Sequence, residues 1–430
     1  MPVRISYKQK NFRDLFQQII QKKRVQFKSV DLEVKKIIAN VIKNGDDSLV
    51  KFAKQYDHFK LSKKNIKFSK SEINNSVKKC RTKTISALKL AAKRIKDFHK
   101  RQFPKNSYYK DSLGIRLGMQ WNPIDSVGVY VPGGSASYPS SVLMNVIPAK
   151  VAGVQRIAMA VPTPQGEINP LVLAAAHILG IEEIYRIGGA QAIAAFAYGT
   201  KSIDPVDKIV GPGNVYVSAA KRQVFGTVGI DMLAGPSEIL IVADKNNNAD
   251  WIAIDLLSQA EHDAQSQSIL ITDSADFLEQ VIGAIKKNLE KLPRKNIAAA
   301  SWGVNGVAIL VKNIDQSLPL INALAPEHLE LCISNPEKMA KKVKNAGAIF
   351  LGNFTPEAVG DYMAGPNHVL PTSRSSRFSS GLNVLDFLTR SSLVKCDKKS
   401  LNKIGPKIIE LADCEGLTAH AFSVMYRIKD

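Results

Sequence analysis

Short apolar runs alternate with Gly-containing turns and longer apolar segments between residues 127 and 237. The apolar runs lie at 127–131, 157–161, 183–187 and from 208, and the segments that follow them lie at 140–151, 170–179, 188–197 and 215–225. A strand, a turn and a helix therefore recur four times, and this alternation is typical of a parallel sheet covered by helices on both faces.

The alternation continues from residue 238. Residues 238–243 (EILIVA), 269–272 and 307–311 predict strands, and residues 277–292 predict an amphipathic helix. Between them, Trp251, Ile254, Leu257 and Ala260 recur every three residues, which predicts a helix that buries this face. Gln259 and His262 are also three apart, so we expect their side chains to share a face of that helix.

Helical periodicity dominates residues 29–103, where no candidate chemistry stands out. The pattern predicts an α/β fold with two Rossmann-like parallel-sheet domains and small helical extensions at both ends. The expected division is an N-terminal helical arm at 1–24, one α/β domain formed by 25–128 together with 238–381, a Rossmann-like domain at 129–237, and a C-terminal piece at 382–430. That last piece is too small to fold alone.

Composition narrows the class of protein. A chain of 430 residues with 45% hydrophobic and 23% charged residues is typical of a soluble protein with more than one core. No apolar run approaches the roughly 20 residues of a membrane span, and the first residues lack the apolar stretch of a secretory signal. The four cysteines form no C-x-x-C pair. We expect a reduced, cytoplasmic protein without a membrane partner.

The charge leaves a second class of function open. The chain has 59 Lys plus Arg against 38 Asp plus Glu, a formal charge of +21, which favours nucleic-acid binding. However, the excess is mostly Lys, spread over the N-terminal region and residues 395–407, without the aromatic interleaving of RNA-binding surfaces. We therefore expect a generally Lys-rich surface and no nucleic-acid partner. Steeply salt-dependent affinity for DNA or RNA would favour the alternative.

Candidate chemistry gathers in the last 170 residues. Four of the seven histidines lie there in polar, Gly-rich contexts, with three carboxylates beside them: His262, His328, His368, His420, Glu327, Asp361 and Glu415. Two or three His with a carboxylate can bind zinc, but no H-E-x-x-H motif is present, so these residues alone leave a metal site open. Glu327 and His328 follow Pro326, which predicts a helix start where both face a cleft. A zinc hydrolase using Glu327 is one alternative.

Three Gly-containing turns suggest a second kind of site. The turns at 132–134, 188–189 and 211–213 would meet at the carboxyl edge of the first sheet, where helix N-termini favour anionic groups. The dinucleotide fingerprint G-x-G-x-x-G is absent, so the pattern leaves nucleotide binding open.

Seven motifs in order give the sequence a specific resemblance. They are 129–134 (VYVPGG), 188–192 (GGAQA), 209–214 (IVGPGN), 234–238 (AGPSE), 258–263 (SQAEHD), 325–329 (APEHL) and 360–362 (GDY). On these motifs the chain resembles histidinol dehydrogenase from about Trp121 to Phe422. The resemblance implies an NAD-dependent zinc enzyme that oxidises L-histidinol through L-histidinaldehyde to L-histidine, the last step of histidine biosynthesis.

The same resemblance implies roles for individual residues. One zinc ion per subunit would be bound by Gln259, His262, Asp361 and His420. Glu327 and His328 match the acid/base pair, and Tyr130, Gln191 and Asn214 match contacts to NAD in the domain at 129–237. Substrate contacts would come from Ser237 and Glu415 together with the zinc ligands and His328. The resemblance also implies a homodimer in which the C-terminal piece completes the partner's site.

Overall fold

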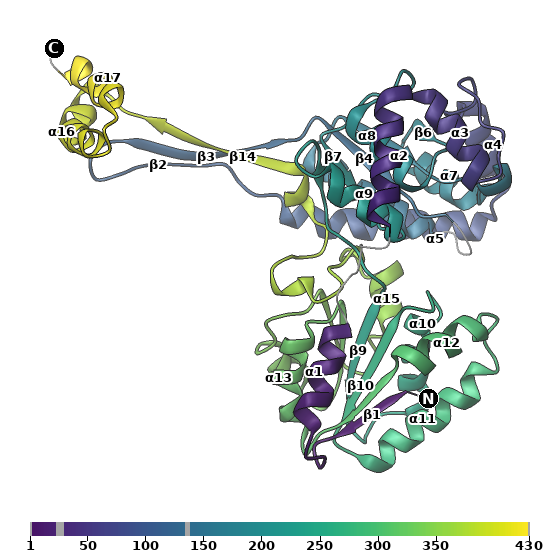
Figure 1. Cartoon of the computed structure of the whole chain (residues 1–430). Coiled ribbons are helices and arrows are strands. Elements are labelled where there is room, and N and C mark those ends of the chain that lie inside the picture. The colour runs from purple at the N-terminus through teal and green to yellow at the C-terminus, as the bar shows by residue number, and fades with distance from the viewer. Residues whose placement is uncertain (1, 23–29, 134–137, 429–430) are drawn as a thin grey trace.

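Two parallel sheets and one antiparallel ribbon organise the chain (Figure 1). The computed structural model describes residues 2–22, 30–133 and 138–428. The predicted α/β fold with parallel sheets is confirmed. Among the described helices, none combines the length and apolar content needed to cross a membrane.

The first sheet has five parallel strands in the order β6-β5-β4-β7-β8. Its strands are β4 (Ser126–Tyr130), β5 (Arg156–Ala160), β6 (Glu183–Tyr185), β7 (Lys208–Val210) and β8 (Gly229–Ile230). The helices that connect them are α6 (Pro139–Ala152), α7 (Pro170–Ile178), α8 (Gly189–Tyr198) and α9 (Val215–Val224). Every residue of β4 is buried, as expected for a parallel strand covered on both faces. We call this sheet and the helices packed on it the five-stranded unit.

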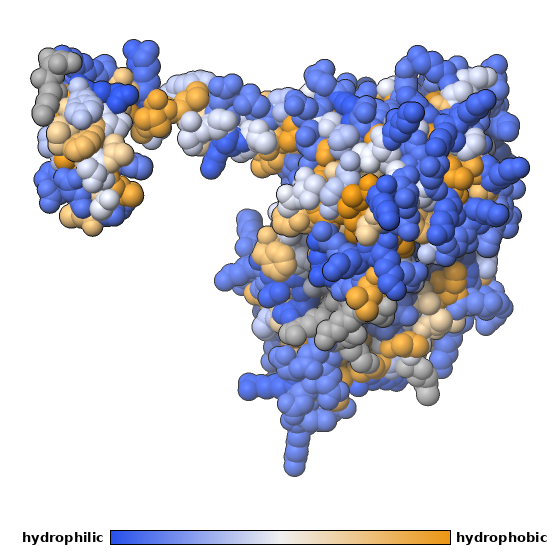
Figure 2. Space-filling model, turned by 45° about the horizontal axis from the view of Figure 1, so that its top comes forward, coloured by the Kyte–Doolittle hydropathy of each residue, from blue (hydrophilic) through white to orange (hydrophobic). Residues whose placement is uncertain are grey.

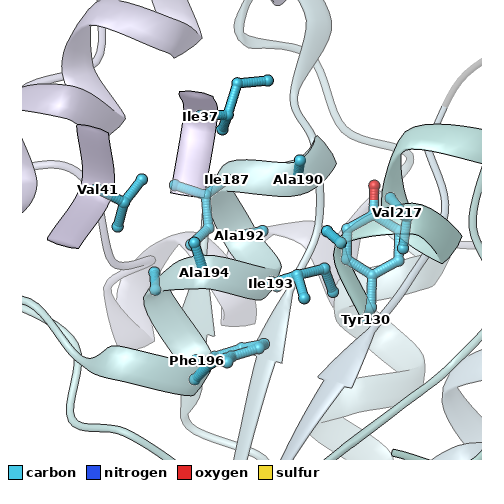
Figure 3. Packing of buried hydrophobic residues seen from close by; sticks show 14 of the residues in the cluster. Ile37, Val41, Tyr130, Ile187, Ala190, Ala192, Ile193, Ala194, Phe196 and Val217 are labelled. Carbon is cyan, nitrogen blue, oxygen red and sulfur yellow. The ribbon is translucent and has the colours of Figure 1, made fainter. Parts of the chain in front are cut away.

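Four earlier helices also belong to the five-stranded unit: α2 (Asp31–Asn44), α3 (Asp46–Tyr56), α4 (Lys70–Lys78) and α5 (Thr82–His99). Ile37 and Val41 of α2 pack with Ala190 and Ile193 of α8 in one apolar core (Figure 3). The expected grouping of residues 25–128 with 238–381 is therefore wrong for these helices. The prediction failed because an apolar helix face can be buried against either sheet, and the periodicity of the helix does not indicate which sheet it is.

The second sheet has six parallel strands in the order β1-β11-β10-β9-β12-β13. The strands are β1 (Val3–Ser6), β9 (Glu238–Ala243), β10 (Gln267–Thr272), β11 (Val307–Leu310), β12 (His328–Cys332) and β13 (Ala348–Leu351). The helices around them are α1 (Phe12–Lys22), α10 (Ala249–Ala260), α11 (Ala275–Leu289), α12 (Lys295–Asn305), α13 (Ser317–Leu324), α14 (Pro336–Ala340) and α15 (Glu357–Tyr362). We call this the six-stranded unit.

The N-terminal segment is an integral part of the six-stranded unit. β1 pairs with β11, and Phe16, Ile19 and Ile20 of α1 are buried in its core. The expectation of a separate helical arm at 1–24 is therefore corrected. The strand β1 has only four residues, which are too few to predict a strand from alternation alone.

Two local predictions near the candidate residues also need correction. In α10, Trp251 and Ile254 are 44% and 41% exposed, whereas Ile252 and Leu256 are buried, so the buried face is rotated from the predicted one. The segment after Pro326 continues into strand β12 and not into a helix, because it pairs with β9 on one side and with β13 on the other.

An antiparallel ribbon extends from the five-stranded unit and carries the C-terminal helices at its far end (Figure 1). It consists of β2 (Ser107–Lys110), β3 (Arg116–Pro123), β14 (Leu388–Lys395), α16 (Lys398–Cys414) and α17 (Thr418–Ile428). Leu382, Val384 and Phe387 are buried in the five-stranded unit, so the projecting part begins at residue 388 and not at 382. Short 3₁₀ turns lie at Lys100–Gln102, Pro164–Gly166, Ile314–Gln316, Ser375–Arg377 and Val384–Phe387.

Candidate active site

The candidate chemistry lies at the amino ends of two neighbouring strands of the six-stranded sheet. Glu238 begins β9 and His328 begins β12, and the two strands are paired side by side. Because α10 connects the parallel strands β9 and β10, its carboxyl end returns to this same edge and brings Gln259 with it. The short helix α15, which lies where the two units meet, adds residues 357–362 (Figure 1).

The imidazole of His328 is buried and held in one orientation. Its Nδ1 lies 3.0 Å from the carbonyl oxygen of Glu238, so Nδ1–H donates to that oxygen. Nε2 is buried without a hydrogen-bond partner among the described residues and lies 3.9 Å from Oδ1 of Asp361. Burial lowers the pKa of His328 to about 4. The ring is therefore neutral near pH 7 and presents the lone pair of Nε2 as a base.

Glu327 lies in the bend that precedes β12. Its Oε2 accepts a hydrogen bond of 2.9 Å from the backbone N–H of Glu238 and lies 3.8 Å from Nδ1 of His328. Because Glu327 precedes the regular strand, its side chain and that of His328 lie together. The structure thus brings the predicted pair into one buried site. The pair lies at the start of a strand and not at the predicted start of a helix.

A second buried carboxylate, Glu357, connects several of these groups. Its Oε1 lies 3.3 Å from Nδ1 of His328, and its backbone N–H donates to Oε1 of Glu330 at 2.7 Å. The amide of Gln259 satisfies the hydrogen bonds of both its ends when it is assigned with its nitrogen facing Glu357. In that orientation Nε2 donates to both carboxylate oxygens, one of them at 2.9 Å. Burial, and then the negative charge of neighbouring carboxylates, raises the pKa of Glu357 and of Glu330 well above the usual value. A cation among these groups would relieve that electrostatic cost.

The donor atoms present fit a divalent metal. His328, Glu357 and Asp361 offer ligand atoms that all lie within 4.8 Å of one another. Nδ1 of His368 lies 3.7 Å from Oδ1 of Asp361. Burial lowers the pKa of His368 as it does that of His328, and His262, which follows α10, is near enough to lower both further. Imidazole nitrogens with carboxylate and amide oxygens are suited to a borderline ion such as Zn²⁺.

The remaining predicted substrate and zinc residues fall in two different places. Ser237 immediately precedes β9, at the same sheet edge as Glu238. Glu415 and His420 are exposed on the C-terminal helices, at the far end of the ribbon from α10 and α15 (Figure 1). Within one chain, the structure brings Gln259, His262 and Asp361 to the site and leaves His420 and Glu415 away from it.

The predicted cofactor contacts gather at the carboxyl edge of the five-stranded sheet. The strand order reverses between β4 and β7, the position where such sheets bind ligands. Tyr130 ends β4, and its hydroxyl oxygen accepts from the backbone N–H of Gly189 at 3.1 Å, while burial raises its pKa to about 12. Gln191 is buried in the first turn of α8. Asn214 caps α9 by accepting from two backbone N–H groups, so only its amide N–H groups remain to bind a ligand.

A close backbone approach shapes this edge. Gly211 follows β7 at φ +111°, and a Cβ there would lie 2.1 Å from the carbonyl oxygen of Tyr130. A side chain at this position is therefore excluded, and the turn after β7 packs directly against the end of β4. Gly134, the last residue of the predicted Gly-containing turn at 132–134, lies outside the described part of the chain.

Sequence reasoning missed the parts played by Glu357 and Glu238. Glu357 lies four residues before Asp361, a spacing that places two carboxylates on one face of a helix and could have drawn attention to it. Glu238 contributes through its backbone carbonyl and N–H groups, and a motif of side chains does not predict such backbone contacts.

Comparison with known proteins places this fold and site among the oxidoreductases. The family model for histidinol dehydrogenase matches residues 20–428. Histidinol dehydrogenase from Rhodospirillum rubrum is 55% identical over 429 residues, covering 100% of this chain and 99% of its own. Histidinol dehydrogenase 1 from a Nostoc species is 54% identical, covering 98% and 97%. The crystal structure of histidinol dehydrogenase from Elizabethkingia anophelis has a TM-score of 0.94 at 37% identity, covering 100% of this chain and 98% of that one. The chain belongs to the histidinol dehydrogenase family.

Proposed function

We propose that this protein catalyses the NAD-dependent, four-electron oxidation of L-histidinol through L-histidinaldehyde to L-histidine. The observation that carries the proposal is the buried, neutral imidazole of His328, which is held by Glu238 with Nε2 facing Asp361. A neutral imidazole that presents a lone pair within a set of metal-binding groups is suited to take a proton from an alcohol.

The metal in this proposal is zinc, one ion per subunit. Gln259, His262 and Asp361 would bind it from one chain, and His420 from a second copy of the chain. Bound zinc would supply coordination positions for the imidazole and amine of the substrate, which fixes the reacting carbon in place.

The residues of the acid/base pair then act in sequence. His328 accepts the hydroxyl proton of L-histidinol as a hydride leaves the carbon that bears this hydroxyl group and is transferred to NAD. The product is the aldehyde. Glu327 takes a proton from water as the water adds to the aldehyde, while His328 returns its proton to the carbonyl oxygen to complete the hydrate. His328 then accepts a hydroxyl proton of the hydrate as a second hydride leaves its carbon for a second NAD. Each oxidation removes two electrons, so one L-histidinol gives L-histidine and two NADH. Burial of both side chains keeps bulk water away from the aldehyde.

A homodimer would complete the site, because His420 and Glu415 lie too far along the ribbon to serve their own chain. The end of the ribbon exposes apolar side chains (Val394, Leu411, Leu417, Phe422 and Tyr426), and Figure 2 shows apolar surface in this region. The six-stranded unit exposes a matching set beside the site, on β13 and α15 and between them (Ile349, Leu351, Phe354, Val359 and Tyr362). Burying these two sets against each other would stabilise a dimer and deliver Glu415 to the substrate and His420 to the metal.

NAD would bind at the edge where β4 and β7 end, with Tyr130, Gln191 and Asn214 as contacts. The N-termini of α8 and α9 lie at this edge and favour the negative charge of a pyrophosphate. The cysteines among the described residues are free thiols, in accord with a reducing, cytoplasmic setting.

Initial rates test the proposal against the zinc hydrolase alternative. The zinc-loaded protein is mixed with NAD and either L-histidinol or an amino alcohol that lacks the imidazole. We expect NADH to form with L-histidinol and far more slowly with the second compound. Hydrolysis of an ester or amide without NAD, and no NADH from L-histidinol, would favour the hydrolase.

A further inference from the structure

We propose that Glu357 is a positioning residue that locks the side-chain amide of Gln259 with its oxygen facing the metal site. The inference rests on the proposed metal site and extends it to a residue with no assigned role. It concerns one question of geometry, which is the end of the Gln259 amide that faces the ligand.

An amide side chain has two ends of nearly the same shape. Only the oxygen can bind a metal, because the nitrogen has no available lone pair. Rotation by 180° would present N–H groups to the cation and abolish binding by this residue. A glutamine is therefore a dependable ligand only where something holds its nitrogen end.

Glu357 supplies that hold. Nε2 of Gln259 donates to both oxygens of the Glu357 carboxylate, one of them at 2.9 Å. A carboxylate offers only acceptor atoms, so two such oxygens beside one amide bind its nitrogen end and repel its oxygen end. Gln259 is 1% exposed, which leaves no access for bulk water to compete for the amide.

Glu357 is itself fixed from two sides. Its backbone N–H donates to Oε1 of Glu330 at 2.7 Å, and its own Oε1 lies 3.3 Å from Nδ1 of His328. The strand β12 thus positions the start of α15, and α15 positions the amide at the end of α10. Partners of this kind, behind the residues that touch the metal, orient those residues and tune affinity.

A double-mutant cycle on zinc affinity tests the assignment. Wild type, Gln259→Ala, Glu357→Gln and the double variant are titrated with Zn²⁺ against a chromophoric chelator. The amide introduced by Glu357→Gln would offer its own N–H groups to the oxygen of Gln259, so we expect this variant to bind zinc about 10- to 100-fold more weakly. Since Glu357 acts through Gln259, we expect the double variant to match Gln259→Ala alone.

Glu330→Gln is the matched control. It makes the same carboxyl-to-amide change in the same buried cluster but keeps an oxygen to accept from the N–H of Glu357. We expect its zinc affinity to stay within a few-fold of wild type. An equal loss in Glu330→Gln and Glu357→Gln would make the effect a general one of replacing a buried carboxyl group and would overturn the proposal.

Two other results would overturn it. Wild-type affinity in Glu357→Gln would show that the amide needs no lock. Losses that add in the double variant would make Glu357 an independent ligand. If wild type itself bound no zinc, the proposed metal function would fail first, and that outcome is distinguishable because it appears before any substitution is made.

Discussion

The carbonyl oxygen of Glu238 lies 3.0 Å from Nδ1 of His328, across the paired strands β9 and β12. A backbone carbonyl held between two paired strands moves less than a side chain does. The contact therefore fixes both the orientation and the tautomer of the imidazole, and it leaves Nε2 to serve as the base.

Replacement of His328 tests this assignment. We expect His328→Ala to lower kcat by about 10²- to 10⁴-fold, the usual contribution of a general base. The zinc content should stay near one ion per subunit, because the proposed ligands are other residues. Metal analysis and steady-state rates on the same preparation check both expectations. Loss of zinc with the imidazole would make His328 a ligand and contradict the assignment.

The position of His420 predicts complementation between two inactive variants. The variant His420→Ala alters the end of the ribbon, and the variant Glu327→Gln alters the part of the site that lies in the six-stranded unit. If the ribbon serves a second copy, each mixed dimer has one intact site. Mixing equal amounts under conditions that exchange subunits should restore about a quarter of the wild-type rate. Either variant mixed with itself is the control, and absence of recovery in a verified mixed dimer would place both residues in the site of one chain.

Zinc binding provides a second readout for the same residue. We expect His420→Ala to weaken zinc binding because one of four proposed ligands is lost. Measurement by chelator competition should show the loss in the dimer. Unchanged affinity would remove His420 from the proposed ligand set.

The core of the five-stranded unit predicts a steric effect at Gly128. A Cβ added there would lie 2.6 Å from the ring of Phe196, which is fully buried. We expect Gly128→Ala to lower the free energy of unfolding by about 1–3 kcal/mol, and Phe196→Leu in the same chain to recover part of it. Gly283→Ala is the control, since nothing lies within 4 Å of its added Cβ on the exposed side of α11. That control should be neutral or stabilising by up to about 1 kcal/mol.

Urea denaturation of all four proteins measures these differences. A Gly128→Ala protein as stable as wild type would mean that Phe196 has room to move, contrary to the complete burial of its ring.

Asp255, on the buried side of α10, predicts a dependence of stability on pH. Burial raises its pKa from 3.8 to about 6. The folded state therefore holds a proton that the unfolded state has lost between these values, so the contribution to stability is present below pH 4 and declines as pH rises through 6. In metal-free protein, the difference in the free energy of unfolding between Asp255→Asn and wild type should shift by about 3 kcal/mol in favour of the variant between pH 4 and pH 7.

The exposed Asp250 offers a contrast of opposite sign. A hydrogen bond from Asn288 lowers its pKa, so its contribution is present above the unfolded value and declines as pH falls. The free energy of unfolding of Asp250→Asn should therefore fall relative to that of wild type as pH rises from 3 to 5. Chemical denaturation at a series of pH values measures both, and parallel curves for Asp255→Asn and wild type would contradict the account of Asp255.

The strands were the most predictable part of the fold. Runs such as Ile239–Ala243 are apolar without interruption because both faces of a parallel sheet are covered, and this pattern needs no tertiary information. The partner of each helix was not predictable, because α2 could bury Ile37 and Val41 against either sheet. Trp251 shows a related limit, since an aromatic residue in a helical pattern does not have to face the core: its ring packs against Phe354 on the surface.

The candidate site divides in the same way. His262, His328 and Asp361 were visible as residue types suited to metal or proton chemistry, and the resemblance gave them roles. The contribution of Glu238 is made by its backbone, and that of Glu357 depends on the contact between α15 and α10, so both required the folded structure. The role proposed for His420 rests on the resemblance alone, because its own chain places it away from the site.

The yield of NADH from a limiting amount of L-histidinol tests the central claim most directly. Purified protein with excess NAD is followed at the absorbance band of NADH, before chelation, after chelation and after zinc is restored. The account predicts two NADH per L-histidinol, loss of the reaction with zinc removed, and recovery on its return. One NADH per L-histidinol would contradict the four-electron oxidation, and no NADH from zinc-loaded dimer would contradict the assigned activity.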